Sequence, residues 1–335
     1  MKTILVTGGP GFIGSNLCDK LLNEGYKVIC LDNLITGSRD NIEPFISNPN
    51  FTFINGDICN YKDCEIAVRD ADCILHQAAL GSVPRSIQKP ILTTNINVLG
   101  FVNILFAAKE AKIKRFIYAA SSSTYGDHPD LPKVEDKIGN PLSPYAITKY
   151  TNELYAENFS KIYDMELIGL RYFNVFGKNQ SPNGAYAAVI PKFIIRLINH
   201  ESPTINGDGS FSRDFTYIDN VVQANLLAIE VDSKKIFNRD KYLSHEIFNI
   251  AFGESTTLNE LVIMLKNNLA NFDENILKIK SIYGPEKKGD VPHSLASIDK
   301  AKNILGYNPK FSVKEGLGIA CKWYYDNYNN NNAFI

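Results

Sequence analysis

A tyrosine and a lysine spaced four residues apart, Tyr145 and Lys149, are the side chains in this sequence best suited to chemistry. Ser143 is a favourable N-cap and Pro144 a favourable first residue for a helix, and residues four apart lie on the same face of a helix. The ammonium is therefore expected beside the phenol, where its positive charge lowers the tyrosine pKa from the usual value of about 10. The pair predicts a group that exchanges protons near neutral pH.

Hydroxyl side chains gather before this pair, in the run Ser121-Ser122-Ser123. The run follows an apolar segment, 115–120, that we predict to be a strand. The carboxyl ends of parallel strands converge on bound ligands where the strand order reverses, so these hydroxyls are expected to bond a reacting substrate oxygen. The alternative interpretation is an ordinary turn rich in serine and threonine.

Three glycines follow the first predicted strand, Gly8, Gly11 and Gly14. Gly8 allows a tight turn, Gly11 lets the backbone approach a pyrophosphate, and Gly14 lets the following helix pack closely on the strand. The start of that helix offers unpaired N–H groups and a positive dipole end to phosphates. Asp32 stands 18 residues after Gly14, where a carboxylate binds ribose hydroxyls and repels a 2′-phosphate. The motif predicts a dinucleotide site that prefers NAD to NADP.

Two further strand ends are predicted to form cofactor walls. Asp57, in Gly56-Asp57-Ile58, could reach an adenine amino group, or could instead be a simple helix N-cap. The run Gln77 to Ser82 contains small residues that would let a flat cofactor lie against the backbone. His76 ends an apolar strand and is expected in the core rather than as a ligand or base.

The candidate site residues must be positioned by strands and helices that alternate along the chain. The predicted strands, each almost continuously apolar, are 2–7, 27–32, 51–55, 72–76, 115–120 and 167–173. The predicted helices are 12–23, 94–111, 144–163, 187–199, 219–231, 257–270 and 313–328. Such an order predicts an α/β protein with a Rossmann-type, doubly wound parallel sheet. We expect an NAD-binding domain from 1–175 with about 215–250, and a smaller α/β substrate domain from about 176–214 and 251–330.

Bulk properties exclude several functional classes. The chain has 335 residues and a formal net charge of -1, which does not favour nucleic acid or an anionic membrane as partners. No apolar run approaches the roughly 20 residues that span a bilayer, and the N-terminus does not read as a signal peptide, so we expect a cytoplasmic protein. The six cysteines lack metal-site spacing and are expected to be buried thiols, with no metal bound.

Eight segments spread over nearly the whole chain form a recognisable set: TGGPGFIGS, HQAALGSVPRSI, AASSSTYGDHP, NPLSPYAITKY, GLRYFNVFG, NGAYAAVIPKF, INGDGSFSRDF and GDVPHS. Together these segments resemble the extended short-chain dehydrogenase/reductase family. More narrowly, the sequence is similar to UDP-N-acetylglucosamine 4-epimerases of bacterial surface-polysaccharide synthesis. The resemblance implies a homodimer joined through a four-helix bundle made by the 94–111 and 144–163 helices.

The resemblance also implies roles for individual residues. Tyr145 would be the acid/base, Ser121 the catalytic serine, and Lys149 would bind the nicotinamide ribose and tune Tyr145. The implied cofactor contacts are Gly8, Gly11, Phe12, Ile13, Gly14, Asp32, Asn33, Gly37, Asp57, Ile58, Gln77, Ala78, Ala79, Tyr145, Lys149, Tyr172 and Val175. The implied UDP-sugar contacts are Gly81, Ser82, Ser121, Ser122, Ser123, Asn174, Ala188, Val189, Asn206, Arg213, Lys287, Asp290 and Ser294. Similar proteins carry arginines where this chain has Lys287 and Pro292, which bears on nucleotide affinity.

The expected reaction is 4-epimerisation of a UDP-sugar. Related dehydratases place an Asp-Glu pair directly after the catalytic hydroxyl, and decarboxylating relatives a glutamate, where this chain has Ser122 and Ser123. A simple sugar reductase and a non-catalytic NAD sensor remain as alternatives, because a fold does not fix a function.

The size of the residues expected near the sugar indicates which sugar is bound. Gly81, Ser82, Ala188 and Ser294 are small and are expected to face it, which leaves room for a 2-N-acetyl group. We therefore predict UDP-GlcNAc and UDP-GalNAc as substrates, with their uronic acid forms as further candidates. The alternative is a UDP-glucose or UDP-glucuronate 4-epimerase.

Overall fold

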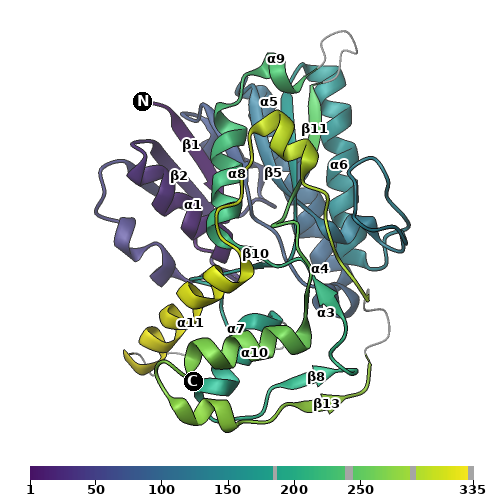
Figure 1. Ribbon diagram of the computed structural model, residues 1–335. Coiled ribbons are helices and arrows are strands. Elements are labelled where there is room, and N and C mark those ends of the chain that lie inside the picture. Colours follow the sequence, from purple (N-terminus) through teal and green to yellow (C-terminus); the bar gives the residue numbers. More distant parts are fainter. Residues whose placement is uncertain (184–186, 238–243, 287–291, 331–335) are drawn as a thin grey trace.

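A seven-stranded parallel sheet forms the centre of the computed structural model, which describes residues 1–335 apart from 184–186, 238–243, 287–291 and 331–335 (Figure 1). Its strands lie in the order β11-β6-β5-β4-β1-β2-β3. Their bounds are β1 Thr3–Thr7, β2 Lys27–Asp32, β3 Phe51–Asn55, β4 Cys73–His76, β5 Arg115–Ser121, β6 Glu166–Tyr172 and β11 His245–Ile250. The order reverses between β1 and β4, which confirms the predicted Rossmann-type fold and places its ligand crevice there.

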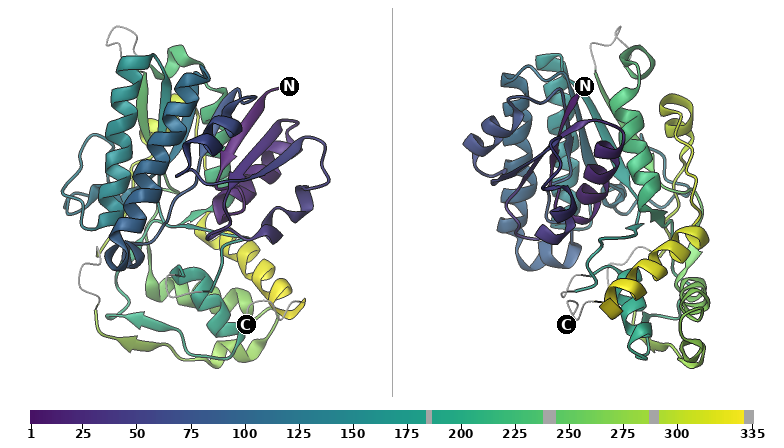
Figure 2. Two further views of the ribbon diagram at one scale, coloured as in Figure 1. Left: turned by 180° about the vertical axis from the view of Figure 1, so that it is seen from behind. Right: turned by 90° about the vertical axis from the view of Figure 1, so that its left-hand side faces the viewer.

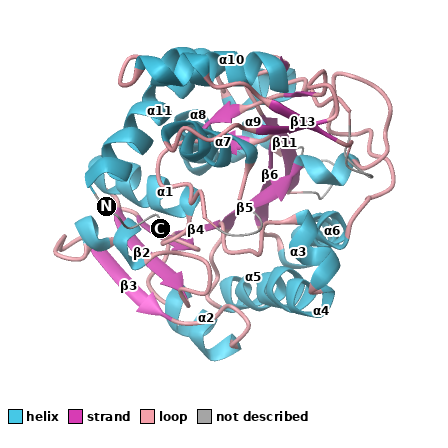
Figure 3. Ribbon diagram, turned by 90° about the horizontal axis from the view of Figure 1, so that it is seen from below, coloured by secondary structure: helices cyan, strands magenta, loops and turns pink. Residues whose placement is uncertain are grey.

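Helices connect the strands and cover both faces of the sheet. Their bounds are α1 Phe12–Asn23, α2 Tyr61–Val68, α3 Val83–Gln88, α4 Pro90–Thr94, α5 Gly100–Glu110, α6 Pro144–Tyr163, α7 Val189–Ile198, α8 Ile218–Glu230, α9 Ser233–Ile236, α10 Leu258–Leu269 and α11 Val313–Asn330. Seen from below, α2, α5 and α6 lie on one side of the sheet, and α1 and α8 on the other (Figure 3).

Alternation along β1 shows how the sheet is sandwiched. Ile4 and Val6 are buried in the cluster that contains α1 and α8, while Leu5 between them is buried against α2 and α5. Side chains of a strand point alternately to its two faces, and each fully buried Leu, Ile or Val contributes roughly 1.5–3 kcal/mol. The apolar runs seen in the sequence therefore belong to strands buried on both sides.

The helix that carries the Tyr-Lys pair, α6, begins where the sequence indicates. The Ser143 hydroxyl accepts a hydrogen bond from the Ala146 N–H (3.1 Å), and Pro144 is the first helical residue. The helix ends at Asp164, which adopts a left-handed conformation (φ 51°). Its first turn stands directly beside the end of β5, so the serine run and the Tyr-Lys pair lie together.

The segment Pro90–Glu110 combines α4, a π-helical turn at Asn95–Leu99 and α5. Its 21 residues have a mean hydropathy of 1.7 over their most apolar window, long and apolar enough to cross a membrane by composition alone. The expectation that no apolar run approaches this length was therefore wrong. Half of that window is buried inside the protein, as in a core helix, because α5 packs on α2 and α6.

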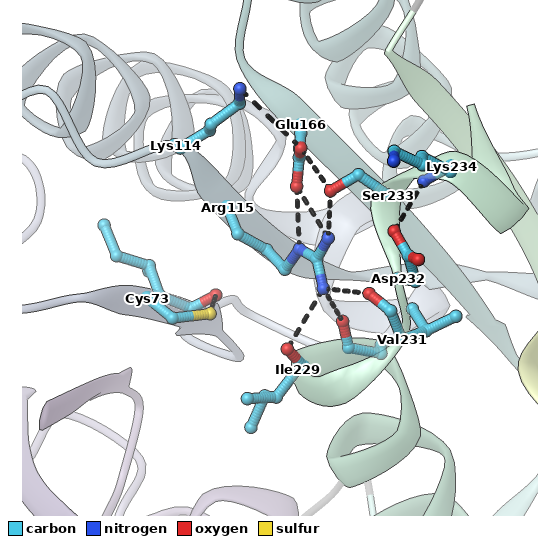
Figure 4. Close-up of polar contacts among 11 residues, drawn as sticks. Cys73, Lys114, Arg115, Glu166, Ile229, Val231, Asp232, Ser233 and Lys234 are labelled. Carbon is cyan, nitrogen blue, oxygen red and sulfur yellow. Dashed lines mark hydrogen bonds and ion pairs between the residues drawn. The ribbon is translucent and has the colours of Figure 1, made fainter. Parts of the chain in front are cut away.

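A buried ion pair ties the amino ends of two strands to the end of α8 (Figure 4). Arg115 donates to Glu166 through both Nε (3.0 Å) and Nη2 (2.6 Å), and Ser233 bonds the same carboxylate. The other guanidinium nitrogen donates to the carbonyls of Ile229 (3.0 Å) and Val231 (2.6 Å), which lie at the last turn of α8. Arg115 thus neutralises a buried carboxylate and satisfies carbonyls that a helix end leaves unpaired.

A smaller group of elements lies beyond the carboxyl ends of the sheet (Figures 1 and 2). It contains α7, α10, α11 and three short strand pairs: β7 Val175–Phe176 with β10 Thr216–Tyr217, β8 Thr204–Asn206 with β13 Ile282–Gly284, and β9 Ser212–Arg213 with β12 Thr256–Thr257. Tyr324 of α11 donates to the Gln180 carbonyl (2.5 Å) and so holds the segment after β7. The exact division into two domains stays a prediction.

The cysteines behave as structural residues. All six lie within the described residues and are free thiols, buried except for the half-buried Cys59. The described residues contain no cluster of three or more His, Cys, Asp or Glu side chains that could hold a metal.

Candidate active site

A cavity of ≈ 830 Å³ lies where the strand order reverses, within the size range of about 300–1,000 Å³ typical of ligand pockets. Its walls come from the segments that follow β1, β2, β3, β4, β5 and β6, from the start of α6, and from the stretch between β7 and α7. Residues that are far apart in sequence therefore meet in one site.

The glycine-rich loop forms the floor of the cavity. Gly8 has φ +76°, and a Cβ there would lie 2.7 Å from the amide nitrogen of Ala78. A Cβ on Gly14 would lie 2.0 Å from the Gly8 carbonyl oxygen, so only glycine lets α1 approach the strand this closely. Gly11 is the N-cap of α1, and the first N–H groups of that helix begin at the cavity. A cradle that any side chain would fill, next to a helix N-terminus, fits the pyrophosphate of a dinucleotide.

Two carboxylates stand at one end of the cavity. Asp32 accepts from the Leu34 N–H (2.6 Å), and burial, with Asp57 nearby, raises its pKa. Asp57 accepts from the Cys59 N–H (2.7 Å) and from the Asn33 amide (3.0 Å). Helix α2 is capped by Asn60 instead, so the alternative that Asp57 is its N-cap is wrong. Both carboxylates line the cavity and suit a ribose and an adenine.

The segment after β4 lines the opposite end. Gln77, Ala78 and Ala79 face the cavity, while His76 is buried and its Nδ1 lies 2.8 Å from the Thr7 hydroxyl. Burial lowers the pKa of His76 to about 3, so its ring stays neutral at physiological pH. His76 is thus a core residue, in accord with its place at the end of an apolar strand.

Tyr145, Ser121 and Lys149 meet in this half of the cavity. The Ser121 hydroxyl hydrogen-bonds the Tyr145 phenol, and the Ser123 hydroxyl donates to Ser121 Oγ (2.8 Å). Lys149 is buried and its ammonium donates to the Ala119 carbonyl (2.8 Å). The arrangement joins a phenol, a hydroxyl and an ammonium at one wall, which is a constellation suited to moving a proton.

The electrostatics of this pair differ from the expectation. Burial raises the pKa of Tyr145, with the Ser121 hydrogen bond acting in the opposite direction, although the sequence suggested that Lys149 would lower it. Burial also lowers the pKa of Lys149 to about 8. The reason is that burial disfavours the charged form of each group and that the Lys149 ammonium is turned to a backbone carbonyl. In the protein alone, the phenol keeps its proton.

The predicted cofactor residues all line this cavity. They are Gly8, Gly11, Phe12, Ile13, Gly14, Asp32, Asn33, Gly37, Asp57, Ile58, Gln77, Ala78, Ala79, Tyr145, Lys149, Tyr172 and Val175. The predicted substrate residues are divided. Those on the lining are Gly81, Ser82, Ser121, Ser122, Asn174 and Ala188. Lys287 and Asp290 lie outside the described residues.

Five predicted substrate residues that the structure describes stand outside the cavity lining: Ser123, Val189, Asn206, Arg213 and Ser294. Local contacts explain their positions. The Ser123 hydroxyl is turned to Ser121, Val189 packs against the core, and Asn206 pairs with Gly284. Arg213 donates to the Pro292 carbonyl (3.0 Å), and the Ser294 N–H donates to the Ser212 carbonyl (3.1 Å). Their contact with substrate stays a prediction.

Sequence reasoning missed other residues on the lining. Arg85 stands on α3, one turn after the N-cap Ser82, and Asn179, Ser181 and Asn183 line the cavity from the stretch after β7. Arg85 could have been found from the quoted segment GSVPRSI, because it lies three residues after a predicted contact. Asn179, Ser181 and Asn183 are residue types common in turns, and such types carry no sign of what they face.

The comparisons with known proteins agree with this geometry. A sequence profile described as the NAD dependent epimerase/dehydratase family matches residues 4–251. A putative UDP-glucose 4-epimerase of Methanocaldococcus jannaschii is 38% identical, over 97% of this chain and 99% of its own.

Two solved structures superpose closely. One is a UDP-N-acetylglucosamine 4-epimerase from Methanobrevibacter ruminantium M1 in complex with UDP-N-acetylmuramic acid, with 37% identity, a TM-score of 0.87, and coverage of 97% of this chain and 98% of that one. The other is a UDP-glucuronic acid 4-epimerase from Bacillus cereus in complex with UDP-glucuronic acid and NAD, with 30% identity, a TM-score of 0.84, and coverage of 97% and 99%. With a glycine cradle, a ribose carboxylate and a Tyr-Lys pair on one cavity, this chain belongs to the NAD-dependent epimerase/dehydratase family of extended short-chain dehydrogenases/reductases, and its cofactor is NAD.

Proposed function

We propose that this protein is a 4-epimerase that interconverts UDP-GlcNAc and UDP-GalNAc through a 4-keto sugar. The observation that carries the proposal is the position of Tyr145, which shares the cavity wall with Ser121 and Lys149. Ser121 is followed by Ser122, so the position where related dehydratases carry an acidic side chain is not acidic in this chain. This favours epimerisation over dehydration. The similar 4-epimerases named above support the same reaction class.

The residues divide the chemistry among them. NAD⁺, when bound, supplies the hydride acceptor at the reacting carbon and a positive charge that favours a phenolate. Tyr145 takes the proton of the C4 hydroxyl and later returns one to the C4 oxygen. Ser121 hydrogen-bonds the phenol and is placed to bond the same sugar oxygen. Lys149 keeps a positive charge beneath the site, which stabilises the charged form of Tyr145 once the cavity is filled.

The choice of an N-acetylated sugar rests on small residues at the sugar end of the cavity. Gly81 has open space where a side chain would stand, and Ser82 and Ala188 also line the wall. These positions leave room for a substituent on C2. Arg85 on the same wall carries the kind of charge that would suit a uronic acid carboxylate, so uronic acid forms belong in the test.

The direct test is incubation of the purified protein with UDP-GlcNAc, UDP-glucose and UDP-GlcNAcA, without added NAD. Chromatographic separation of the C4 epimers should show UDP-GalNAc from UDP-GlcNAc at the highest kcat/KM. Faster turnover of UDP-glucose or UDP-GlcNAcA would overturn the substrate assignment. Protein that carries NAD but converts none of the three would favour a non-catalytic NAD sensor.

Replacing the proposed acid/base separates chemistry from binding. Tyr145→Phe should leave NAD bound and lower kcat by at least about 100-fold, because it removes one positioned proton-transfer group. Cofactor released by heating and quantified by absorbance checks the first point, and epimer separation the second. Retention of full turnover by the phenylalanine variant would contradict the mechanism.

We also propose that two copies of the chain join through α4–α5 and α6. Leu92, Leu99 and Phe106 are exposed at seven-residue intervals on one segment, and Ile147 and Leu154 repeat the spacing on α6. The blue α5 and teal α6 stand side by side in the rear view of Figure 2 and pack on each other. A seven-residue apolar repeat on two neighbouring helices that run in the same direction predicts that each copy contributes two helices to the seam of a four-helix bundle.

A further inference from the structure

Three polar side chains behind one wall of the cavity form a closed hydrogen-bonded ring. They are Gln77, directly after β4, Tyr172, at the end of β6, and Asn225, in the middle of α8. Gln77 and Tyr172 line the cavity, whereas Asn225 is fully buried and stands outside its lining as the structure describes it. Asn225 takes no part in the proposed proton transfer.

The geometry fixes the direction of the amide hydrogen bonds in the ring. Asn225 Nδ2 lies 2.8 Å from the Val221 carbonyl, which can only accept, so the amide nitrogen must be on that side. The same nitrogen donates to the Tyr172 hydroxyl (2.9 Å), and that hydroxyl lies within donating distance of two oxygens of the ring, Gln77 Oε1 (3.2 Å) and Asn225 Oδ1 (3.3 Å). Gln77 Nε2 closes the ring by donating to Asn225 Oδ1 (3.3 Å). Burial raises the pKa of Tyr172 to about 12, so its hydroxyl keeps the proton that the ring needs.

The position of the ring along the crevice identifies what its front faces. The glycine cradle follows β1, and Asp32 and Asp57 follow β2 and β3 on one side of it. Gln77 and Tyr172 follow β4 and β6 on the other side, where Tyr145 and Lys149 also stand. A dinucleotide that places its pyrophosphate at the cradle and its adenosine at the carboxylates must extend its nicotinamide half toward this wall.

We propose that Asn225 is a positioning residue for the cofactor. It anchors the Tyr172 hydroxyl and the Gln77 amide from behind, so that both form a rigid wall for the nicotinamide half of NAD. A wall whose rotamers are already fixed loses less conformational entropy when the ligand binds, and this strengthens binding. The proposal depends on NAD being the cofactor and not on which UDP-sugar is converted.

The test compares Asn225→Leu, Tyr172→Phe and the double variant with the unchanged protein. The matched control is Asn220→Leu. Asn220 is buried on the same helix but bonds the backbone of Lys310 and Phe311, away from the ring. For each protein stripped of cofactor, calorimetry gives the Kd for NAD and thermal unfolding gives Tm. Incubation of the loaded protein with the UDP-sugar that the unchanged protein converts then gives the fraction of cofactor left as NADH, read from its fluorescence.

Asn225→Leu and Tyr172→Phe should each raise the Kd for NAD by about tenfold, the effect of losing a buried hydrogen bond. The double variant should bind NAD with a Kd no higher than that of the weaker-binding single variant, because both changes break the same ring. Asn220→Leu should lower Tm and leave the Kd unchanged, and only the ring variants should accumulate NADH.

A purely structural role for Asn225 would give the opposite pattern: a lower Tm with an unchanged Kd, as for the control. Additive effects in the double variant would also overturn the proposal. If Asn225→Leu does not fold, Tyr172→Phe decides alone, since it removes the hydroxyl without adding bulk, and an unchanged Kd for NAD in that variant would refute the ring.

Discussion

Lys149, to which we assign a role in the active site, is a buried charge that is expected to destabilise the fold. The residue is 3% exposed, and burial lowers the pKa of its ammonium from 10.5 to about 8. The sequence predicted that Lys149 would stand near Tyr145, because helical spacing fixes that. It could not predict which effect controls the pKa values, because burial depends on every element that surrounds the pair.

Removing this charge should therefore stabilise the fold. Lys149→Met keeps the length of the side chain, and at pH 7 it should raise the free energy of unfolding of cofactor-free protein by about 1–3 kcal/mol, given about 1.4 kcal/mol per pKa unit. Between pH 8 and 10.5 the unfolded chain binds more protons than the folded chain, so the free energy of unfolding of the wild-type protein rises with pH in this range. The difference in stability between Lys149→Met and the wild-type protein should therefore shrink as the pH rises. Urea unfolding at pH 7 and pH 9.5 measures both effects.

Lys161→Met serves as the control for this measurement. Lys161 lies on the same helix but is exposed beside Glu157, so its loss should change stability by less than about 0.5 kcal/mol. A Lys149→Met variant that is no more stable than wild type at pH 7 would show that the buried ammonium carries no such cost.

At the scale of elements, most helices and strands were visible in the sequence because apolar residues repeat with the right period. The strand β11 was missed, since His245, Glu246 and Asn249 interrupt its apolar pattern and its pairing with β6 joins residues far apart. The break of Pro90–Glu110 into two helices around a π-helical turn also left no periodic sign.

The ion pair between Arg115 of β5 and Glu166 of β6 should contribute strongly to the stability of the fold. Arg115→Met leaves Glu166 buried without its main cation and leaves the last carbonyls of α8 unpaired, so it should destabilise by about 3–5 kcal/mol. Lys114→Met is the control, because Lys114 is exposed and lies 4.0 Å from the same carboxylate. Adding Glu166→Gln to Arg115→Met should recover part of the loss, and equal effects of Arg115→Met and Lys114→Met in urea unfolding would disprove this contribution.

For the whole molecule, the sequence described the cofactor half of the site far better than the substrate half. Gly8 and Asp32 sit at the ends of strands whose order follows from the fold class, and Gly14 lies in the first turn of α1 between them. Asn206, at the end of β8, and Ser294, in a loop, are positioned by packing between distant segments, and this packing has no local pattern. The sequence could name the segments expected near the substrate, but it could not predict which of their side chains line the cavity.

The proposed dimer can be tested at the same scale. Leu154→Glu on α6 would bury a charge in the bundle seam, so it should convert the protein to a monomer in size-exclusion chromatography with light scattering. Ile263→Glu on α10 is the matched control, because Ile263 is exposed away from that face and should leave the dimer intact. A monomeric wild-type protein, or a Leu154→Glu dimer as stable as the control, would refute the bundle.

The bond from Tyr324 to the Gln180 carbonyl connects the last helix to the active-site wall. Gln180 lines the cavity between β7 and α7, and Tyr324 is fully buried behind it. Trimming the chain from its carboxyl terminus is therefore not a neutral way to shorten this protein. A deletion that passes position 324 removes a brace from the catalytic chamber, although the glycine cradle lies more than three hundred residues earlier in the chain.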